Sequence, residues 1–404
     1  MILHITTWRT GGAGIAAKRL HLALLKEGLP SYMLSLGGVP DPEQKIDVLP
    51  KRYLRFWLRG LGRLGFSMTE EQRWEKVKAK AGLSKISASS IRSDALLARH
   101  PWVAQANLIN LHWVTGVLDW PTFFANVDKP IVWTMHDMNP FLGCFHYEVD
   151  RERAGNAGEC VDRELLLQKK HFLASKDGLT CVAPSSWLSK KASNSDLLAR
   201  FQHEVIPNGL DTTIFKRHDK QFARSVFDLP IDKRIVLVVS ESLSNHRKGL
   251  DILIKAFGHC KPGKDWLVTA VGDGKMPIEG HVSFRNIGSI HDERLMSLLY
   301  SAVDLVVVPS REDNLPNVVL EALCCGTPVV GTPVGGLPEL IFDGENGFLA
   351  DDTTPAALAR AIEKALKSDF DANLIRKSAV AKFDQLVQAR RYKILYEKIL
   401  GYTL

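Results

Sequence analysis

Two acidic residues that follow an apolar run are the first candidates for chemistry in this chain. The run at 304–308 predicts a buried parallel strand, and a polar loop follows it. A helix is then expected to begin near Pro316, because a proline loses no hydrogen bond at the first helical position. Asp313 falls on the loop, whereas Glu321 falls about two turns into the helix on a similar side.

Backbone N–H groups at that helix start could bind an anion, since they have no partner within the helix and lie at its positive end. The residues that would offer them are Asn314, Leu315, Asn317 and Val318. A diphosphate at the helix start, with a carboxylate beside it for sugar hydroxyls, suits a nucleotide-sugar. The alternative is an ordinary strand–loop–helix connection in which both acids are only solvated.

A second candidate is the pair His136-Asp137, which ends the apolar run 130–134. Ligands bind at the carboxyl ends of the strands in open α/β sheets. A histidine there can hydrogen-bond a sugar hydroxyl or move a proton near neutral pH, although a lone histidine is more often structural. His146 and His112 are weaker candidates that could shape a pocket nearby.

A third candidate is the basic pair Arg247-Lys248, just before a helix expected from Gly249. Cations at a helix start oppose the helix dipole, so an anion between them would explain the pair. Two solvated surface charges are an equal alternative.

Gly11, Gly12 and Gly14 follow the first strand, where glycines allow a sharp turn and close approach to a ligand. A tight strand–helix turn explains these glycines equally well.

Strand and helix patterns alternate along the whole chain, which predicts an α/β fold with two Rossmann-like sheets. Apolar runs that predict strands lie at 2–7, 31–36, 107–111, 130–134, 180–183, 203–206, 234–239, 266–271, 304–308 and 328–331. Predicted helices lie at 14–27, 162–176, 186–193, 249–260, 291–301, 316–325, 355–366 and 385–402. The turn signal Asn208-Gly209 marks the junction between the two halves.

Length, charge and cysteine usage narrow the class of protein. The 404 residues fit two domains, and 45% hydrophobic content excludes wholesale disorder. Residues 51–100 hold twelve Lys or Arg against four Asp or Glu, which accounts for the net charge of +7. The near-neutral remainder disfavours a general nucleic-acid binder. The six scattered cysteines predict free thiols in a reducing compartment rather than a metal site at Cys144, His146 and Cys160.

The acid-bearing segment resembles the E-x7-E region of family 4 glycosyltransferases, which are retaining enzymes of the GT-B fold. The first acid is Asp313 rather than Glu, with Glu312 one place earlier, so either could fill the first role. The Arg-Lys-Gly run resembles the family position where a lysine, here Lys248, holds the donor diphosphate. Many relatives carry an arginine where this chain has Ser242. His136-Asp137 is similar to the family's H-D motif.

The resemblance implies a role for each matching residue. His136, Asp137 and Asp313 would be catalytic, with His136 facing the transferred sugar. Gly11, His112 and His146 would line the acceptor side. Donor-binding residues would be Gly12, Gly14, Asn208, Ser242, Arg247, Lys248, Ile287, Asn314, Leu315, Asn317, Val318 and Glu321.

The resemblance also implies the domains and the reaction. Residues 1–206 would form an acceptor domain, which contains a basic helical insertion at about 45–100. Residues 207–384 would form a donor domain. Residues 385–404 would form a helix that packs back on the first domain. The enzyme would transfer a hexosyl group from a nucleotide-diphosphate sugar to a saccharide, in the biosynthesis of surface polysaccharide. It would need neither a metal nor a further cofactor. Alternatives are a nucleotide-sugar 2-epimerase and a non-catalytic carbohydrate or polyanion binder.

The segment 51–66 predicts a basic amphipathic helix. One stripe carries Arg52, Arg55, Arg59 and Arg63, and leucines with Trp57 lie opposite. Such a helix can lie in an anionic membrane surface, which suits a lipid-linked acceptor, or it can pack on its own domain. No secretory signal or membrane span is recognised, so we expect a cytoplasmic protein, with peripheral attachment to the inner membrane face as a variant.

Overall fold

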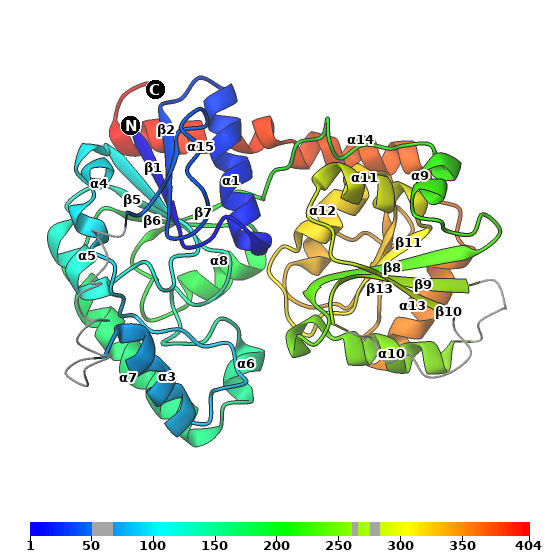
Figure 1. The fold of residues 1–404 in the computed structure, drawn as a ribbon, viewed down its shortest axis with the longest axis horizontal. Coiled ribbons are helices and arrows are strands. Elements are labelled where there is room, and N and C mark those ends of the chain that lie inside the picture. Colours follow the sequence, from blue (N-terminus) through cyan, green and yellow to red (C-terminus); the bar gives the residue numbers. More distant parts are fainter. Residues whose placement is uncertain (51–67, 261–265, 275–282) are drawn as a thin grey trace. The chain divides into compact units, whose positions relative to one another are not determined.

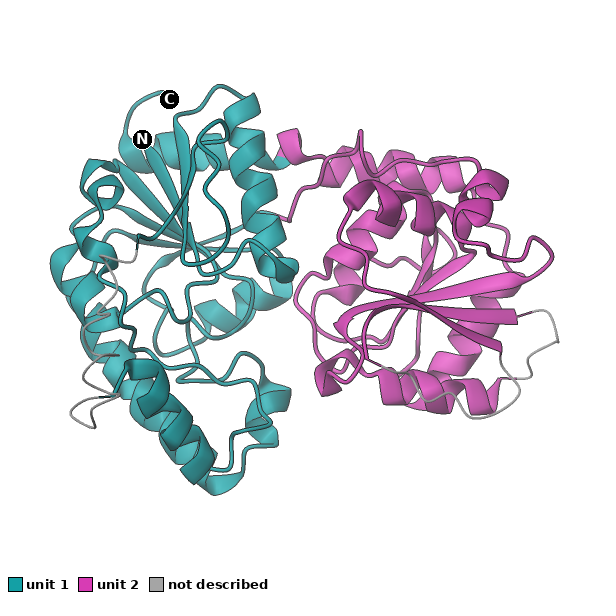
Figure 2. Ribbon diagram, in the orientation of Figure 1, with its two compact units in different colours: residues 1–206, 388–404 teal, residues 207–387 magenta. Residues whose placement is uncertain are grey.

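A computed structural model describes residues 1–50, 68–260, 266–274 and 283–404 (Figure 1). The chain forms two compact units, 1–206 with 388–404 and 207–387, coloured separately in Figure 2. Each unit contains one wholly parallel sheet. The predicted basic helix at 51–66 lies outside the described residues.

The first unit contains a seven-stranded sheet in the order β3-β2-β1-β4-β5-β6-β7. Its strands are β1 (Ile2–Thr6), β2 (Ser31–Ser35), β3 (Ile46–Val48), β4 (Leu108–Leu111), β5 (Ile131–Thr134), β6 (Leu179–Ala183) and β7 (Gln202–Val205). Its helices include α1 (Gly11–Lys26), α3 (Glu70–Lys80), α4 (Pro101–Gln105), α5 (Trp120–Asn126), α6 (Glu148–Glu152), α7 (Gly155–Leu173) and α8 (Ser186–Ser193). Both faces of β1, β4 and β5 are buried, which explains why these strands are continuous apolar runs.

The second unit contains a six-stranded sheet in the order β10-β9-β8-β11-β12-β13. Its strands are β8 (Arg234–Ser242), β9 (Trp266–Asp273), β10 (Ser283–Gly288), β11 (Leu305–Val308), β12 (Val329–Gly331) and β13 (Gly347–Leu349). Its helices are α9 (Lys220–Val226), α10 (Leu250–His259), α11 (Glu293–Ala302), α12 (Asn317–Cys324), α13 (Pro355–Lys367) and α14 (Ala372–Phe383). Alternate residues of β8 pack on opposite faces, Ile235 and Leu237 on one and Val236 and Val238 on the other.

The final helix α15 (Gln385–Leu400) completes the core of the first unit. Tyr392 and Tyr396 are fully buried with α1 residues and with Ile2. Their hydroxyl groups are satisfied within the same core. The Asn110 amide donates to the Tyr396 hydroxyl at 2.7 Å, and the Tyr392 hydroxyl lies 2.9 Å from Thr134 Oγ1. Residues 388–404 are therefore an integral part of the first unit.

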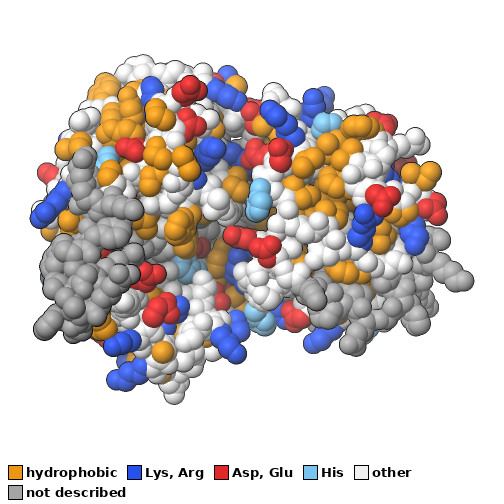
Figure 3. Space-filling view, viewed as in Figure 1, with side chains coloured by type: hydrophobic (Ala, Val, Ile, Leu, Met, Phe, Trp, Pro, Cys, Tyr) orange, Lys and Arg blue, Asp and Glu red, His pale blue; other side chains and the backbone are white. Residues whose placement is uncertain are grey.

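The ten strands predicted from apolar runs are all present within a few residues, whereas β3, β10 and β13 were not predicted. Ile287, a donor candidate, lies near the end of β10. Within the described residues, no helix combines the length and apolarity needed to cross a membrane. On the face drawn in Figure 3, Lys and Arg side chains lie among Asp and Glu rather than in one basic patch.

Candidate functional site

The glycines after β1 form the first turn of α1 rather than a loop before it. The sequence predicted a helix from residue 14, but α1 begins at Gly11, which has a φ of 69°. A Cβ on Gly14 would lie 2.3 Å from the Trp8 carbonyl oxygen, so a side chain is excluded there. The glycines thus form the first turn of α1, which four residues separate from the end of β1, and the first N–H groups of a helix have no partner within it.

A row of histidines crosses neighbouring strands of the first unit, with His4 and His112 buried and His136 half-buried. His4 lies in β1, His112 follows β4 and His136 follows β5, and these strands are adjacent in the sheet. His4 Nδ1 lies 2.9 Å from His112 Nε2, and His112 Nδ1 lies 3.2 Å from His136 Nε2. The rings form a continuous chain of hydrogen-bonded imidazoles that reaches His136.

Burial keeps these imidazoles neutral at physiological pH. It lowers the pKa of His136 to about 4, even though the neighbouring Asp137 opposes the shift. Burial also lowers the pKa values of His4 and His112 well below their ordinary value, with a smaller effect from the neighbouring imidazoles. A neutral His136 can donate or accept a hydrogen bond but carries no charge.

Asp137 anchors the loop that follows β5. Its Oδ2 atom accepts from the Trp113 indole at 2.9 Å and lies 2.6 Å from His146 Nδ1, while Oδ1 accepts from the Asn139 N–H at 2.9 Å. Burial alone would raise the pKa of Asp137, but the interactions with His146, Asn139 and Trp113 lower it. His146 Nε2 in turn lies 2.8 Å from the hydroxyl of Ser89.

Two further buried charges fix the same loop. Lys169 on α7 is fully buried and donates to the carbonyl oxygen atoms of Asn139 and Leu142 at 2.5 and 2.7 Å. Burial lowers the pKa of this ammonium group to about 7. Asp162 accepts from the backbone N–H groups of Cys144 and Phe145 at 2.7 and 3.3 Å. Side chains of α7 therefore hold the backbone after His136-Asp137 through hydrogen bonds.

In the second unit, the basic pair and the first acid form one ionic cluster. Lys248 Nζ lies 2.7 Å from Asp313 Oδ2, and an Arg247 guanidinium nitrogen lies 3.3 Å from Asp313 Oδ1. The same arginine donates to the Glu312 carbonyl oxygen at 2.8 Å. The sequence predicted that an anion lies between these two cations. In this structure that anion is the carboxylate of Asp313.

Asp313 is held ionised in a buried position. Burial alone would raise its pKa, but Lys248, Arg247 and the Ser310 hydroxyl hold it at about 2. Its Oδ1 atom also accepts from the Asn314 N–H at 3.1 Å. The expectation that this N–H is free to face an anion is therefore wrong for Asn314, because Asp313 uses it.

The helix α12 begins one residue later than predicted, at Asn317, with Pro316 as the N-cap. Asn208 donates to the Asn317 side chain at 3.2 Å, which connects the start of the second unit to this helix start. Glu321 lies further along α12, is 8% exposed, and accepts from the Tyr300 hydroxyl at 2.9 Å. Its orientation is thereby fixed by α11.

The remaining donor candidates differ in position. Ser242 ends β8 and its hydroxyl lies 2.9 Å from that of Ser244. Ile287 sits at a register shift of β10, between Asn286 and Gly288. Leu315 is buried and Val318 half-buried, both against the core of the second unit. These last two therefore contribute packing through their side chains, and only their backbone is available for a ligand.

The structure brings the predicted residues together in two groups within separate units. The first contains His112, His136, Asp137 and His146, and the second contains Arg247, Lys248, Asp313 and Asn314. Sequence reasoning missed His4 and Lys169. A histidine inside the apolar strand 2–6 is a signal that could have identified His4, since a buried imidazole needs a partner. No comparable signal distinguishes Lys169 from Lys170.

Comparison with known proteins decides how the second group is interpreted. Residues 233–368 match the family described as glycosyl transferases group 1. The matched segment contains the whole ionic cluster and α12. This part of the chain resembles a glycosyltransferase.

The curated relatives match over a limited length. A D-inositol 3-phosphate glycosyltransferase of Acidothermus cellulolyticus is 33% identical over 198 residues, 43% of this chain and 42% of that protein. The enzyme of the same name from Mycolicibacterium smegmatis is 34% identical over 189 residues, 40% and 43% of the two chains. The chain thus spans about two fifths of the length of the curated relatives it matches.

Solved structures match over nearly the whole chain. Sucrose-phosphate synthase from Thermosynechococcus elongatus gives a TM-score of 0.71 at 20% identity, covering 99% of both chains. Anabaena HepE, solved in complex with UDP-glucose, gives 0.65 at 19% identity, covering 98% of this chain and 99% of that one. The predicted α/β fold with two Rossmann-like units of GT-B type is confirmed.

Proposed function

We propose that this protein is a retaining glycosyltransferase that moves a hexosyl group from a nucleotide-diphosphate sugar to a saccharide hydroxyl. The observation that carries the proposal is the cluster of Lys248, Arg247 and Asp313 beside the start of α12, within the segment that matches the glycosyl transferases. Cations next to a helix N-terminus suit a diphosphate leaving group.

The donor would lie on the second unit. Lys248 and Arg247 would neutralise the diphosphate. The Lys248 ammonium group would then contact both the phosphate and the carboxylate of Asp313. Glu321, held by Tyr300, would accept hydrogen bonds from the ribose. The UDP-glucose bound to HepE supports a uridine nucleotide as the first donor to test. Two side-chain cations beside the diphosphate also support a reaction that needs no divalent metal.

The acceptor would lie on the first unit. His136, neutral and held by His112, would hydrogen-bond the transferred sugar, and Asp137 would keep the following loop in place. The acceptor would be a saccharide, lipid-linked, in surface polysaccharide synthesis. The resemblance of the H-D segment supports the role of His136, and the basic segment 51–66 supports a lipid-linked acceptor.

The test is a screen of the purified protein against UDP-, GDP- and dTDP-sugars. A donor at one hundred times its Kd should stabilise the folded state by about 2.7 kcal/mol, read as a rise in Tm. Transfer to a saccharide, with the anomeric configuration of the product determined by NMR, then tests the reaction. Stabilisation with epimerised sugar and no transfer would identify an epimerase instead. Stabilisation by none of the donors would contradict the proposal.

A further inference from the structure

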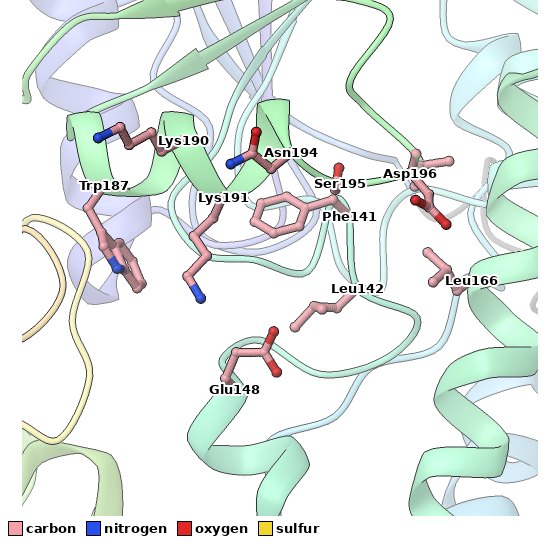
Figure 4. A pocket seen from close by; sticks show the side chains of 11 residues that line it. Phe141, Leu142, Glu148, Leu166, Trp187, Lys190, Lys191, Asn194, Ser195 and Asp196 are labelled. Carbon is pink, nitrogen blue, oxygen red and sulfur yellow. The ribbon is translucent and has the colours of Figure 1, made fainter.

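A pocket of about 580 Å³ lies on the first unit, beside the loop that leaves His136-Asp137 (Figure 4). Its apolar wall comes from Phe141 and Leu142 on that loop, with Leu166 on α7. The volume lies within the range of small-molecule sites and is large enough for a sugar ring or two. Neither the histidine row nor the ionic cluster of the second unit contributes to its lining.

The wall of the pocket is fixed rather than loosely packed. Lys169 holds the carbonyl oxygen of Leu142, and Asp137 holds the start of the same loop through Asn139. Phe141 and Leu142 are 5% and 7% exposed. A wall whose backbone is hydrogen-bonded to buried charges is preorganised, so little ordering remains to be done when a ligand binds.

The polar groups of the pocket have an uneven charge balance. Glu148 pairs with Arg151 at 3.3 Å, and Asp196 pairs with Lys170 at 3.0 Å, so both acids already have a cation. Lys190 and Lys191 on α8 also line the pocket, and within the described part of the chain their ammonium groups form no ion pair. Among the described residues, the two acids of the lining are thus each paired with a cation outside it, whereas the two lysines have no carboxylate of their own.

An aromatic ring stands next to this charge. Trp187 is half-buried on α8, whose start is capped by the Ser185 hydroxyl. In Figure 4, Trp187 and Lys191 extend from α8 toward Glu148 on α6, whereas Lys190 points away from it. A flat indole offers a face to the apolar side of a pyranose ring, and Lys191 lies where a substituent on that ring would reach it.

We propose that this pocket is a subsite for an acidic saccharide, with Trp187 stacked on the sugar ring and Lys191 binding a carboxylate or phosphate group on it. As the place where the acceptor is held, it rests on the proposed function. Binding itself does not, because the pocket lies entirely within the first unit. The loop that forms its apolar wall follows His136-Asp137 directly in the sequence.

The experiment measures binding to the full chain without nucleotide, by titration calorimetry at low and high salt. The probes are methyl glucuronide, glucose 6-phosphate and the neutral methyl glucoside. Both acidic probes should bind at least tenfold more tightly than the neutral one, with an affinity that falls as salt rises. The two acidic probes distinguish a carboxylate from a phosphate by their relative affinity. Equal affinity for acidic and neutral probes, or no binding of either, would overturn the proposal.

Matched variants locate the site. Lys191→Gln should weaken the acidic probes by about fivefold and leave the neutral probe unchanged, the scale of one partly exposed ion pair. Lys190→Gln should have a smaller effect, and Lys85→Gln, an exposed lysine outside the pocket, should have none. Trp187→Ala should weaken all probes together. An equal effect of Lys85→Gln and Lys191→Gln would place the charge elsewhere and reject the subsite.

The outcomes separate this proposal from the proposed function. If Lys191→Gln transfers sugar to neutral and acidic acceptors with unchanged kcat/KM, and binds acidic probes like the parent, the subsite is wrong and the transferase stands. If the parent binds acidic saccharides through Lys191 but binds no nucleotide-sugar, the transferase is wrong and the subsite stands.

Discussion

Lys248 and Asp313, sixty-five positions apart, meet at 2.7 Å in the second unit. The contact joins the turn before α10 to the loop before α12, and Arg247 reinforces it from the same turn. An incoming diphosphate would therefore meet a lysine that Asp313 already orients. Asp313 in this arrangement positions the cation, while its role as a catalytic acid remains a prediction.

Lys248→Ala should reduce sugar transfer by roughly 10²–10³, the scale for the loss of one preorganised charge partner. The measurement is turnover at saturating donor. Lys255→Ala, an exposed lysine on α10, is the control and should retain parental activity. Asp313→Asn should lower the free energy of unfolding by about 1–3 kcal/mol, since it removes the carboxylate that both Lys248 and Arg247 contact. If the Lys248→Ala variant turned over at the rate of the parent, Lys248 would not belong to the site.

Glu321→Ala should abolish nucleotide-sugar binding while the protein remains folded, because Glu321 on α12 is the proposed ribose ligand. Calorimetric titration with the donor found in the screen is the measurement, and far-UV circular dichroism checks the fold. Tyr300→Phe removes only the hydrogen bond that orients Glu321 and should weaken binding less. A Glu321→Ala protein that binds the donor as tightly as the parent would show that the ribose contact lies elsewhere.

Acid should destabilise the protein through histidines whose pKa is lowered in the folded state. The folded-state pKa of His136 and of His21 is about 4, below the ordinary value of 6.5. The unfolded chain therefore takes up protons first as the pH falls, so stability is present above pH 6.5 and lost toward pH 4. Each histidine should contribute about 3 kcal/mol to this loss.

The measurement is Tm by scanning calorimetry from pH 7.5 to 4.5. His136→Gln should flatten the fall in Tm, whereas His259→Gln, at an exposed position on α10, should leave it unchanged. Identical pH profiles for the parent and His136→Gln would mean that the carboxylates alone cause the acid lability.

Activity should survive EDTA, because side-chain cations would balance the charge of the diphosphate. The measurement is transfer after dialysis against the chelator, with and without added Mg²⁺ or Mn²⁺. A loss of activity that either metal restores would contradict a metal-independent reaction.

The segment 51–66 should bind anionic vesicles. Each basic residue near such a surface adds about 1 kcal/mol, and salt screens the attraction. The assay is co-sedimentation with vesicles containing phosphatidylserine, compared with neutral vesicles. Replacing Arg52, Arg55, Arg59 and Arg63 with Gln should abolish the difference. Equal partition onto both vesicle types, or none onto either, would return the segment to a structural role.

The long apolar runs were predictable because a strand buried on both faces of a parallel sheet has nothing polar to place along it. The strands β3 and β13 have three residues each and were not predicted, whereas the equally short β12 was predicted because it lies in the run 328–331. In the site, the meeting of Lys248 with Asp313 was not predicted, although both residues were selected. Contacts between two loops depend on the register of β8 with β11, which no local spacing encodes.

Residues 388–404 close the face of the first sheet that α1 covers, with Tyr392 and Tyr396 in the middle of the core. A ribosome makes residues 1–206 first, and then has to make the entire second unit before that helix exists. At 5–20 residues per second, the delay is on the order of ten to forty seconds. During this time α1 covers only its own part of that face, and the apolar side chains of Ile2, Leu108 and Val132 that also pack with α15 lack this cover. Exposed apolar surface of this kind is what chaperones bind.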